Sequence, residues 1–301
     1  MRTSWIETDD VRLRVEHRGP SEAPAVLLLH GFPDHRGVWD PVADRLGDDH
    51  HVVTVDVRGS GDSEAPRGRS GYRIERLVDD VAAVVAHALP GGRPVHLVGH
   101  DWGSIQGWAV LERSMRPESS LSGRIATFTS ISGPSLEAYG EFVRSGLRRG
   151  RVLAVGRQLV RSWYAAAFQL PVLPELVLGR WGPVIADRLA HAEGLAASEA
   201  GSPWDEGFVR DAVHGVNLYR ANLGRVLQRP TSVDLPVQLV VPTRDRYVLP
   251  HLHDGLERHV PNLSRVELVA GHWAPRTQPE LVADLVRGFV AEQERPLRVV
   301  G

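Results

Sequence analysis

An aspartate flanked by glycines, Asp101 in the segment Gly99-His100-Asp101-Trp102-Gly103, is the first residue whose setting suggests chemistry. A short apolar run at residues 95–98 precedes the segment and a stretch with helical spacing follows it, which predicts a strand, a sharp turn and a helix. Such a turn needs glycines because its backbone passes close to neighbouring chain, and it exposes the central side chain. The pattern predicts a nucleophilic Asp101; an aspartate that only caps a helix is the alternative.

Two further residues stand where they could serve this nucleophile. His272 follows the last predicted strand, at residues 266–269, and could act as a base. Asp245 follows the preceding predicted strand, at residues 237–241, and could orient the imidazole ring. The loop after the strand predicted at residues 125–131 offers no carboxylate, so no other acid competes with Asp245 for this role. The order Asp101, Asp245, His272 predicts a catalytic triad in which the histidine activates water.

A glycine turn upstream could stabilise negative charge near the nucleophile. The segment Leu29-His30-Gly31-Phe32-Pro33 follows an earlier strand and leaves backbone N–H groups free. We expect an oxyanion hole formed by the N–H of Phe32 and by that of Trp102, directly after Asp101. The loop at residues 56–63 follows the next strand and is interpreted as a structural loop beneath the site.

Short apolar, β-branched runs alternate with stretches of helical spacing along most of the chain. Runs that are apolar throughout are typical of strands buried on both faces, and their alternation with helices predicts an α/β fold with a mostly parallel central sheet flanked by helices. Strands are predicted at residues 11–16, 25–29, 52–55, 95–98, 125–131, 237–241 and 266–269, and helices at residues 74–89, 105–112 and 280–293.

The alternation stops between residues 133 and 233. No strand pattern is convincing there, whereas helix-like stretches are punctuated by Pro171, Pro174 and Pro183 and by a polar loop at residues 196–206. We interpret this region as an insertion into the sheet-forming chain. The predicted division is a core at 1–133, a helical cap at 134–232 and the second part of the core at 233–301.

The composition narrows the chemistry further. The chain of 301 residues has no Cys, and all 35 of its basic residues are Arg. These absences exclude a thiol nucleophile, a thiolate metal site, a disulfide framework, a lysine base and a Schiff base. The formal net charge of −2 gives no overall field that would attract nucleic acid or an anionic membrane.

The chain has no pattern of a targeting or membrane-spanning segment. Residues 1–7 are polar, and no stretch approaches the roughly 18 apolar residues of a spanning helix. We therefore expect a cytoplasmic protein without a membrane span, a nucleic-acid partner, a metal or a cofactor. Whether it is a monomer or a homodimer stays open.

At these motifs the sequence resembles the epoxide hydrolases of the α/β-hydrolase fold that use an aspartate nucleophile. His30-Gly31-Phe32-Pro33 and Gly99-His100-Asp101-Trp102-Gly103 match their pattern. The resemblance covers nearly the whole chain, cap included, and extends to epoxide-hydrolase-like proteins of actinobacteria, some of which carry a fused dehydrogenase domain not expected here. It implies that an epoxide and water react to a vicinal diol through a covalent ester of Asp101, which water activated by His272 then hydrolyses.

The resemblance also nominates two cap tyrosines as hydrogen-bond donors to the epoxide oxygen. Tyr164 stands in a Tyr-x-x-x-Phe-Gln-x-Pro pattern, and Tyr219 stands in an Asn-x-Tyr-Arg pattern. Core tyrosines whose hydroxyls are satisfied elsewhere are the alternative. Aromatic residues near these motifs predict an apolar substrate site, with contacts from Trp102, Phe32, Trp163, Phe168 and Trp273.

Other functions compete with this hypothesis. A haloalkane or haloacid dehalogenase would use the same nucleophile, but haloalkane dehalogenases typically have Asn at the place of Phe32, and fluoroacetate dehalogenases usually have Arg at the place of Trp102. A ligand-binding protein that keeps the fold without turnover belongs to another class. Hydrolysis of an ester or lactone is disfavoured because Asp101 stands where such enzymes have Ser.

Two groups of basic residues are interpreted as surface features. His251, His253 and His259 lack the spacing of metal ligands and are expected on the surface. The arginines near the start of the cap are expected to form a solvated helix face rather than an anion or membrane site. They are Arg144, Arg148, Arg149, Arg151, Arg157 and Arg161.

Overall fold

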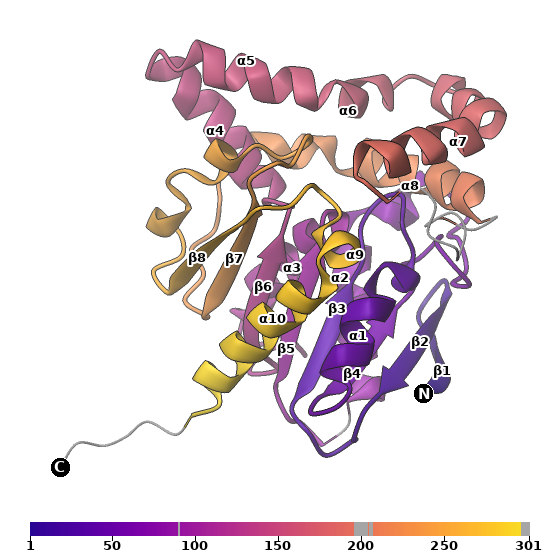
Figure 1. Cartoon of the computed structure of the whole chain (residues 1–301), viewed down its shortest axis with the longest axis vertical. Helices are drawn as coiled ribbons and strands as arrows, with labels where there is room; N and C mark the ends of the chain where they lie inside the picture. Colours follow the sequence, from indigo (N-terminus) through magenta and orange to yellow (C-terminus); the bar gives the residue numbers. More distant parts are fainter. Residues whose placement is uncertain (90, 196–203, 205–206, 296–301) are drawn as a thin grey trace.

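A twisted sheet of eight strands forms the centre of the molecule (Figure 1). The computed structural model describes residues 1–89, 91–195, 204 and 207–295. The strands are β1 (Arg2–Glu7), β2 (Arg12–Arg18), β3 (Ala25–Leu29), β4 (His51–Val55), β5 (Val95–His100), β6 (Ile125–Ile131), β7 (Val237–Pro242) and β8 (Leu263–Leu268). Their order in the sheet is β1-β2-β4-β3-β5-β6-β7-β8.

Most strand pairs are parallel, as the sequence predicts. β1 and β2 pair antiparallel, and β2 is antiparallel to β4. The other neighbours, from β4 to β8, pair parallel. β3, β4 and β5 are buried along their whole length, which explains why these segments are largely apolar rather than alternating between apolar and exposed polar residues.

Helices cover both faces of the sheet and join its strands. The α-helices are α1 (Asp40–Leu46), α2 (Ile74–Ala88), α3 (Trp102–Ser114), α4 (Leu136–Arg148), α5 (Val152–Arg161), α6 (Trp163–Ala167), α7 (Leu173–Ala192), α8 (Phe208–Asn222), α9 (Ala274–Thr277) and α10 (Pro279–Gln293). Short 3-10 helices are η1 (Arg36–Trp39), η2 (Arg69–Tyr72), η3 (Leu223–Leu227), η4 (Pro250–His253) and η5 (Leu256–Arg258). α1 and α10 pack together on one face, and α2 and α3 pack together on the other (Figure 1).

The strand β1 was missing from the sequence prediction. Its segment is polar, and only Ile6 is buried while Trp5 is half exposed. β1 forms one edge of the sheet and pairs with β2 alone, so it needs little apolar surface. The hydrophobic pattern that identifies the inner strands is therefore absent here.

Between β6 and β7 the described residues form α4 to α8 and η3 and no strand. α5 and α6 lie along one edge of the molecule, beyond the carboxyl ends of the parallel strands (Figure 1). Pro183 lies inside α7 and does not end a helix, contrary to its interpretation as punctuation. The polar loop predicted at residues 196–206 lies outside the described residues except for Trp204. The division into core and cap at residues 133 and 232 stays a prediction.

The loop at residues 56–63 is held by buried polar contacts. Arg58 forms a bidentate pair with Asp80, with both N–O distances 2.6 Å. The Asp56 carboxylate accepts the backbone N–H groups of Arg36 and Asp62. Both residues are thus engaged in holding local structure, which agrees with the structural interpretation of this loop.

No helix of the described part of the chain is long and apolar enough to cross a bilayer.

Candidate active site

Asp101 occupies the sharp turn between β5 and α3. Its φ of 52° lies in the left-handed region that non-glycine residues rarely adopt. The turn is tight enough that a Cβ added to Gly103 would stand 2.1 Å from the carbonyl oxygen of Leu29. A strained aspartate beside an obligatory glycine is the arrangement predicted from the sequence, and such strain persists where surrounding structure enforces it.

The upstream glycine turn reaches this aspartate. The backbone N–H of Phe32 donates to Oδ1 of Asp101 at 2.7 Å. Trp102 is the first residue of α3, so its N–H has no carbonyl partner within the helix. These are the two N–H groups that the sequence nominates for the oxyanion hole. The N–H of Phe32 contacts the Asp101 carboxylate, and Trp102 directly follows Asp101 in the chain.

His272 stands between the two aspartates. Its Nδ1 lies 2.9 Å from Oδ2 of Asp245, and its Nε2 lies 3.5 Å from Oδ2 of Asp101. Burial by itself would lower the pKa of His272, but the charges and hydrogen bonds of Asp245 and Asp101 raise it well above its ordinary value. Burial likewise opposes ionisation of Asp245, and His272 with two backbone N–H groups nevertheless lowers its pKa.

The two nominated tyrosines come from different helices and meet above Asp101. Tyr164 lies on α6 and Tyr219 on α8, with 5.8 Å between their ring centroids. The Tyr219 ring also packs edge-on against Trp102 at 5.0 Å. Burial, with the nearby Asp101 charge, raises the pKa of both hydroxyls, so they stay protonated at neutral pH and can donate hydrogen bonds.

A cavity of about 810 Å³ brings these groups together. Most of its walls are apolar, and it is large enough for a drug-sized ligand. Asp101 lies at its lining together with both tyrosines, and the polar groups therefore face a mostly apolar space. Further lining residues include Trp102, Ile105, Leu136, Tyr139, Val143, Leu159, Trp163, Leu223, Tyr247 and Val248.

Only some of the residues predicted to contact substrate line the cavity. Trp102 and Trp163 line the cavity, whereas Phe32 and Phe168 pack behind Tyr219 at ring distances of 5.4 and 5.1 Å. Trp273 lies outside the cavity lining, and its buried indole donates to Asp34 at 2.7 Å, so its contact with substrate stays a prediction. The residue after His272 points into the core because its indole nitrogen satisfies a buried carboxylate.

Tyr247 and His100 belong to the site but were missed. The Tyr247 N–H donates to Oδ1 of Asp245 at 2.7 Å, and its ring packs edge-on against His272 at 4.9 Å. Burial first, then neighbouring carboxylates, raise the Tyr247 pKa to about 12. His100 Nε2 lies 2.9 Å from the backbone oxygen of His272 and orients that loop. The position of Tyr247 two residues after Asp245 was the available signal.

Asp34 connects Trp204, which lies between α7 and α8 in the chain, with the loop that carries His272. Its buried carboxylate accepts the indole N–H groups of Trp204 and Trp273 at 2.9 and 2.7 Å, and lies 3.2 Å from Arg276. Burial raises the pKa of Asp34, but Arg276 and the hydrogen bonds outweigh this and lower it. The carboxylate is therefore a charged anchor between segments far apart in the sequence.

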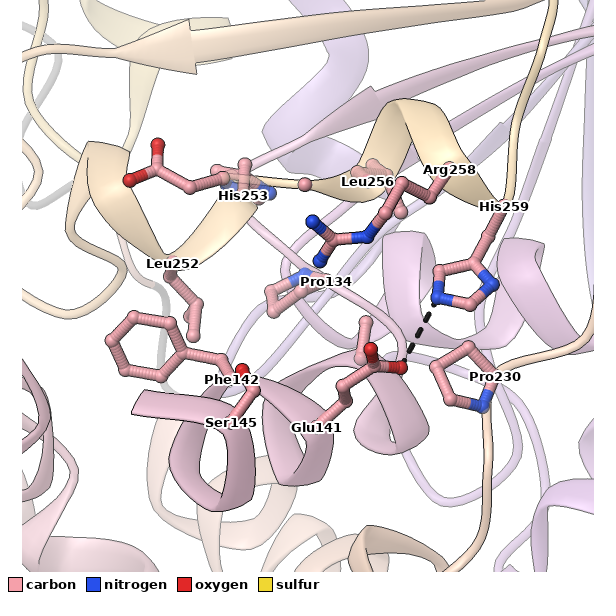
Figure 2. A pocket seen from close by; sticks show the side chains of 13 residues that line it. Pro134, Glu141, Phe142, Ser145, Pro230, Leu252, His253, Leu256, Arg258 and His259 are labelled. Atoms are coloured by element: carbon pink, nitrogen blue, oxygen red, sulfur yellow. Dashed lines mark hydrogen bonds and ion pairs between the residues drawn. The ribbon is translucent and has the colours of Figure 1, made fainter. Parts of the chain in front are cut away.

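His253 and His259, both predicted to lie on the surface, differ in their burial and in their partners. His253 is buried, which corrects the sequence interpretation, and burial lowers its pKa to about 4. His259 pairs with Glu141 at 3.1 Å across a small hollow that Pro134 and Leu252 also line (Figure 2). No three His, Asp or Glu side chains among the described residues are arranged to hold a metal ion.

Comparisons with known proteins agree with this architecture. A family profile described as the alpha/beta hydrolase fold matches residues 24–277. The chain is 36% identical over 315 residues to "Probable oxidoreductase EphD" of Mycobacterium tuberculosis, covering 97% of this chain and 50% of that protein. It is 28% identical over 301 residues to "Epoxide hydrolase 3" of Xenopus tropicalis, covering 95% and 77%. The chain thus spans about half the length of the first of these relatives.

Solved structures share the whole fold. An epoxide hydrolase of Bacillus megaterium in complex with an inhibitor superposes with a TM-score of 0.78 at 23% identity, covering 96% of this chain and all of that one. Epoxide hydrolase VrEH1 from Vigna radiata gives a TM-score of 0.74 at 26% identity, covering 97% and 98%. The profile match, the eight-stranded sheet and these superpositions agree: the chain belongs to the α/β-hydrolase-fold family.

Proposed function

We propose that this chain is an epoxide hydrolase that converts an epoxide and water to a vicinal diol. The observation that carries the proposal is one mostly apolar cavity whose lining includes Asp101 and the protonated tyrosines Tyr164 and Tyr219. An epoxide needs an anionic nucleophile at carbon and a proton donor at oxygen. Relatives and solved structures whose names include "epoxide hydrolase" support the proposal.

In the first half-reaction, the Asp101 carboxylate attacks one epoxide carbon. The C–O bond of that carbon breaks, and the epoxide oxygen takes a proton from a tyrosine hydroxyl. Tyr164 and Tyr219 stabilise the negative charge that develops on this oxygen. The product is an ester between the Asp101 side chain and a hydroxyalkyl group, which is covalent catalysis by a carboxylate.

In the second half-reaction, His272 takes a proton from water, and the resulting hydroxide attacks the ester carbonyl. Collapse of the tetrahedral intermediate breaks the bond to the hydroxyalkyl oxygen, which takes the proton of the new carboxylic acid and leaves as the diol. The proton held by His272 returns to the deprotonated tyrosine, and the ionised Asp101 is restored. The Asp101 charge helps to raise the pKa of His272 in the free protein. Esterification removes this charge, so the pKa of His272 falls and the neutral ring becomes available as a base. The N–H of Phe32 donates to Asp101 Oδ1 and would stabilise the tetrahedral oxyanion on that atom.

The direct test is product analysis with a panel of aliphatic, aryl and polycyclic epoxides. We expect diol formation, and no halide release from haloalkanes or haloacids, because the Phe32 side chain has no hydrogen-bond donor for a leaving halide. A dehalogenase would release halide and leave the epoxides untouched. A ligand-binding protein would do neither, and either of these results would contradict the proposal.

The tyrosines give a second test. Tyr164→Phe and Tyr219→Phe should each slow ester formation by about 1–3 kcal/mol of transition-state stabilisation, or roughly five- to hundredfold. The double variant should nearly abolish the step, measured by pre-steady-state loss of epoxide. Tyr72→Phe is the control, because this buried tyrosine lies beside Gly59 outside the cavity. Normal rates in the double variant would disprove the donor assignment.

A further inference from the structure

The helix α5 has its apolar side turned outward. A helix on the surface of a globular protein normally buries its apolar face. α5 buries Val155 and Gln158, whereas Leu153 and Val160 are 79% and 71% exposed. At the start of α6, Trp163 is 67% exposed. We name this exposed set the cap surface: Val152, Leu153, Leu159, Val160 and Trp163.

The cap surface continues beyond these two helices. Val172, Leu173 and Leu176 are exposed at the beginning of α7, which follows the end of α6 along the same edge of the molecule (Figure 1). Large apolar side chains that are exposed together on neighbouring helices favour an interaction site over ordinary surface. Helical spacing explains the face on α5, because Val152 and Leu159, like Leu153 and Val160, are seven positions apart, which is about two helical turns.

Arginines accompany the five residues of the cap surface, and its continuation at the start of α7 includes one acidic residue, Glu175, which pairs with Arg220. From Phe142 to Pro174 the sequence contains six Arg and no Asp, Glu or Lys. Arg157 and Arg161 lie on α5, where Arg161 directly follows Val160, and both side chains are exposed. At the start of the helix, Arg151 pairs with Asp254 at 2.9 Å, while Arg157 and Arg161 form no ion pair with any described residue. The exposed apolar face is therefore bordered by positive charge.

We propose that the cap surface docks on an anionic lipid bilayer, whereas the sequence alone favoured a solvated helix face for these arginines. An amphipathic helix with apolar residues and Trp on one side and arginines beside them lies in the plane of a membrane interface. The arginines reach lipid phosphates, the apolar side chains enter the acyl boundary, and Trp163 takes the interfacial position that Trp prefers. Docking needs no spanning helix, in agreement with the helices described.

Charge also distinguishes a bilayer from a second copy of the chain. A symmetric dimer formed through this face would bring Arg157 and Arg161 of one protomer towards the same arginines of the other. Residues 142–174 contain no carboxylate that could pair them, and like charges brought together oppose association. The membrane proposal is independent of the reaction assigned to Asp101, although Leu159 and Trp163 also line the Asp101 cavity.

The test is co-sedimentation of the 301-residue chain with vesicles of phosphatidylcholine, with and without phosphatidylglycerol. We expect binding to the anionic vesicles, weak binding to the neutral ones, and loss of binding at high salt. Arg157→Gln and Arg161→Gln should each weaken binding roughly fivefold. The double variant Leu153→Glu, Val160→Glu should reduce binding by at least about tenfold, because it places charge in the apolar face.

Matched controls locate the effect. Leu281→Glu alters an exposed apolar residue of α10, and Arg116→Gln alters an exposed arginine just after α3; both should bind as the unaltered chain does. Thermal unfolding reports whether each variant is folded. Equal binding to neutral and anionic vesicles, no binding at all, or equal losses in the controls would overturn the proposal. So would a dimer, seen by light scattering, that Leu153→Glu dissociates while vesicles stay unbound.

Discussion

A His272→Gln variant should consume about one equivalent of epoxide and then stop. Opening the epoxide needs an ionised Asp101 and a donor for the leaving oxygen, and neither step uses His272 as a base. Hydrolysis of the ester does use it, because neutral water is a poor nucleophile. We expect the second step to slow by on the order of 10²- to 10⁴-fold, the usual contribution of a general base.

Intact-protein mass spectrometry measures this arrest directly. The His272→Gln chain should gain the mass of the intact epoxide, and peptide mapping should place the adduct on Asp101. Asp245→Asn should arrest less completely, because Asp245 acts by orienting His272, whose Nδ1 lies 2.9 Å away. His87→Gln is the control, since this exposed histidine lies on α2, away from the cavity, and hydrogen-bonds the Ala83 carbonyl of the same helix. Free turnover by His272→Gln, or no adduct in a folded variant, would falsify the assignment.

Asp101→Ala should lose turnover by on the order of 10⁴-fold or more, the loss typical when a covalent nucleophile is removed. The fold should survive. Because φ is 52° at this position, we expect Ala to be strained there, as Asp is, and Asp101→Gly to be free of that strain. Both variants should be inactive and folded, which separates loss of chemistry from loss of structure.

Isotope labelling separates the covalent route from direct attack by water. In a single turnover in heavy-oxygen water, the label should enter the Asp101 carboxylate first, because hydroxide attacks the ester carbonyl of this side chain. The diol formed in that turnover should carry none. After one turnover, peptide mass analysis measures the label in Asp101, and mass spectrometry of the released diol measures the label in the product. Label that appears in the diol during the first turnover would contradict the ester intermediate.

The inner strands and the turn at Asp101 could be predicted because their determinants are local. β3 is apolar throughout, and β5 and β7 are largely apolar, since both of their faces are buried; the strand ends then place Asp101, Asp245 and His272 at one edge. β1 could not be predicted in this way because an edge strand needs few apolar residues. The positions of Tyr164 and Tyr219 were inferred from a resemblance, not from periodicity.

Side-chain directions were the part that the sequence could not supply. Trp273 follows His272 in the chain but turns away to Asp34, a partner 239 positions distant. His253 is buried although its neighbours suggested a polar surface. The outward apolar face of α5 was also missed, because a mixture of arginines and aliphatic residues looks the same in sequence whichever side faces the core. Tertiary packing decides each of these cases.

The Asp34 anchor ties the opening of two distant segments to each other. If the indole of Trp204 or that of Trp273 moved away, the buried Asp34 carboxylate would lose one hydrogen-bond donor, which costs on the order of a few kcal/mol. Once one indole has left, water can reach the Asp34 carboxylate and replace the other donor. Trp204 with the start of α8, where Phe208 packs on it, and the His272 loop should therefore open as one cooperative unit. In native-state hydrogen exchange, amides of α8 and of the His272 loop should become unprotected together, with one shared opening free energy.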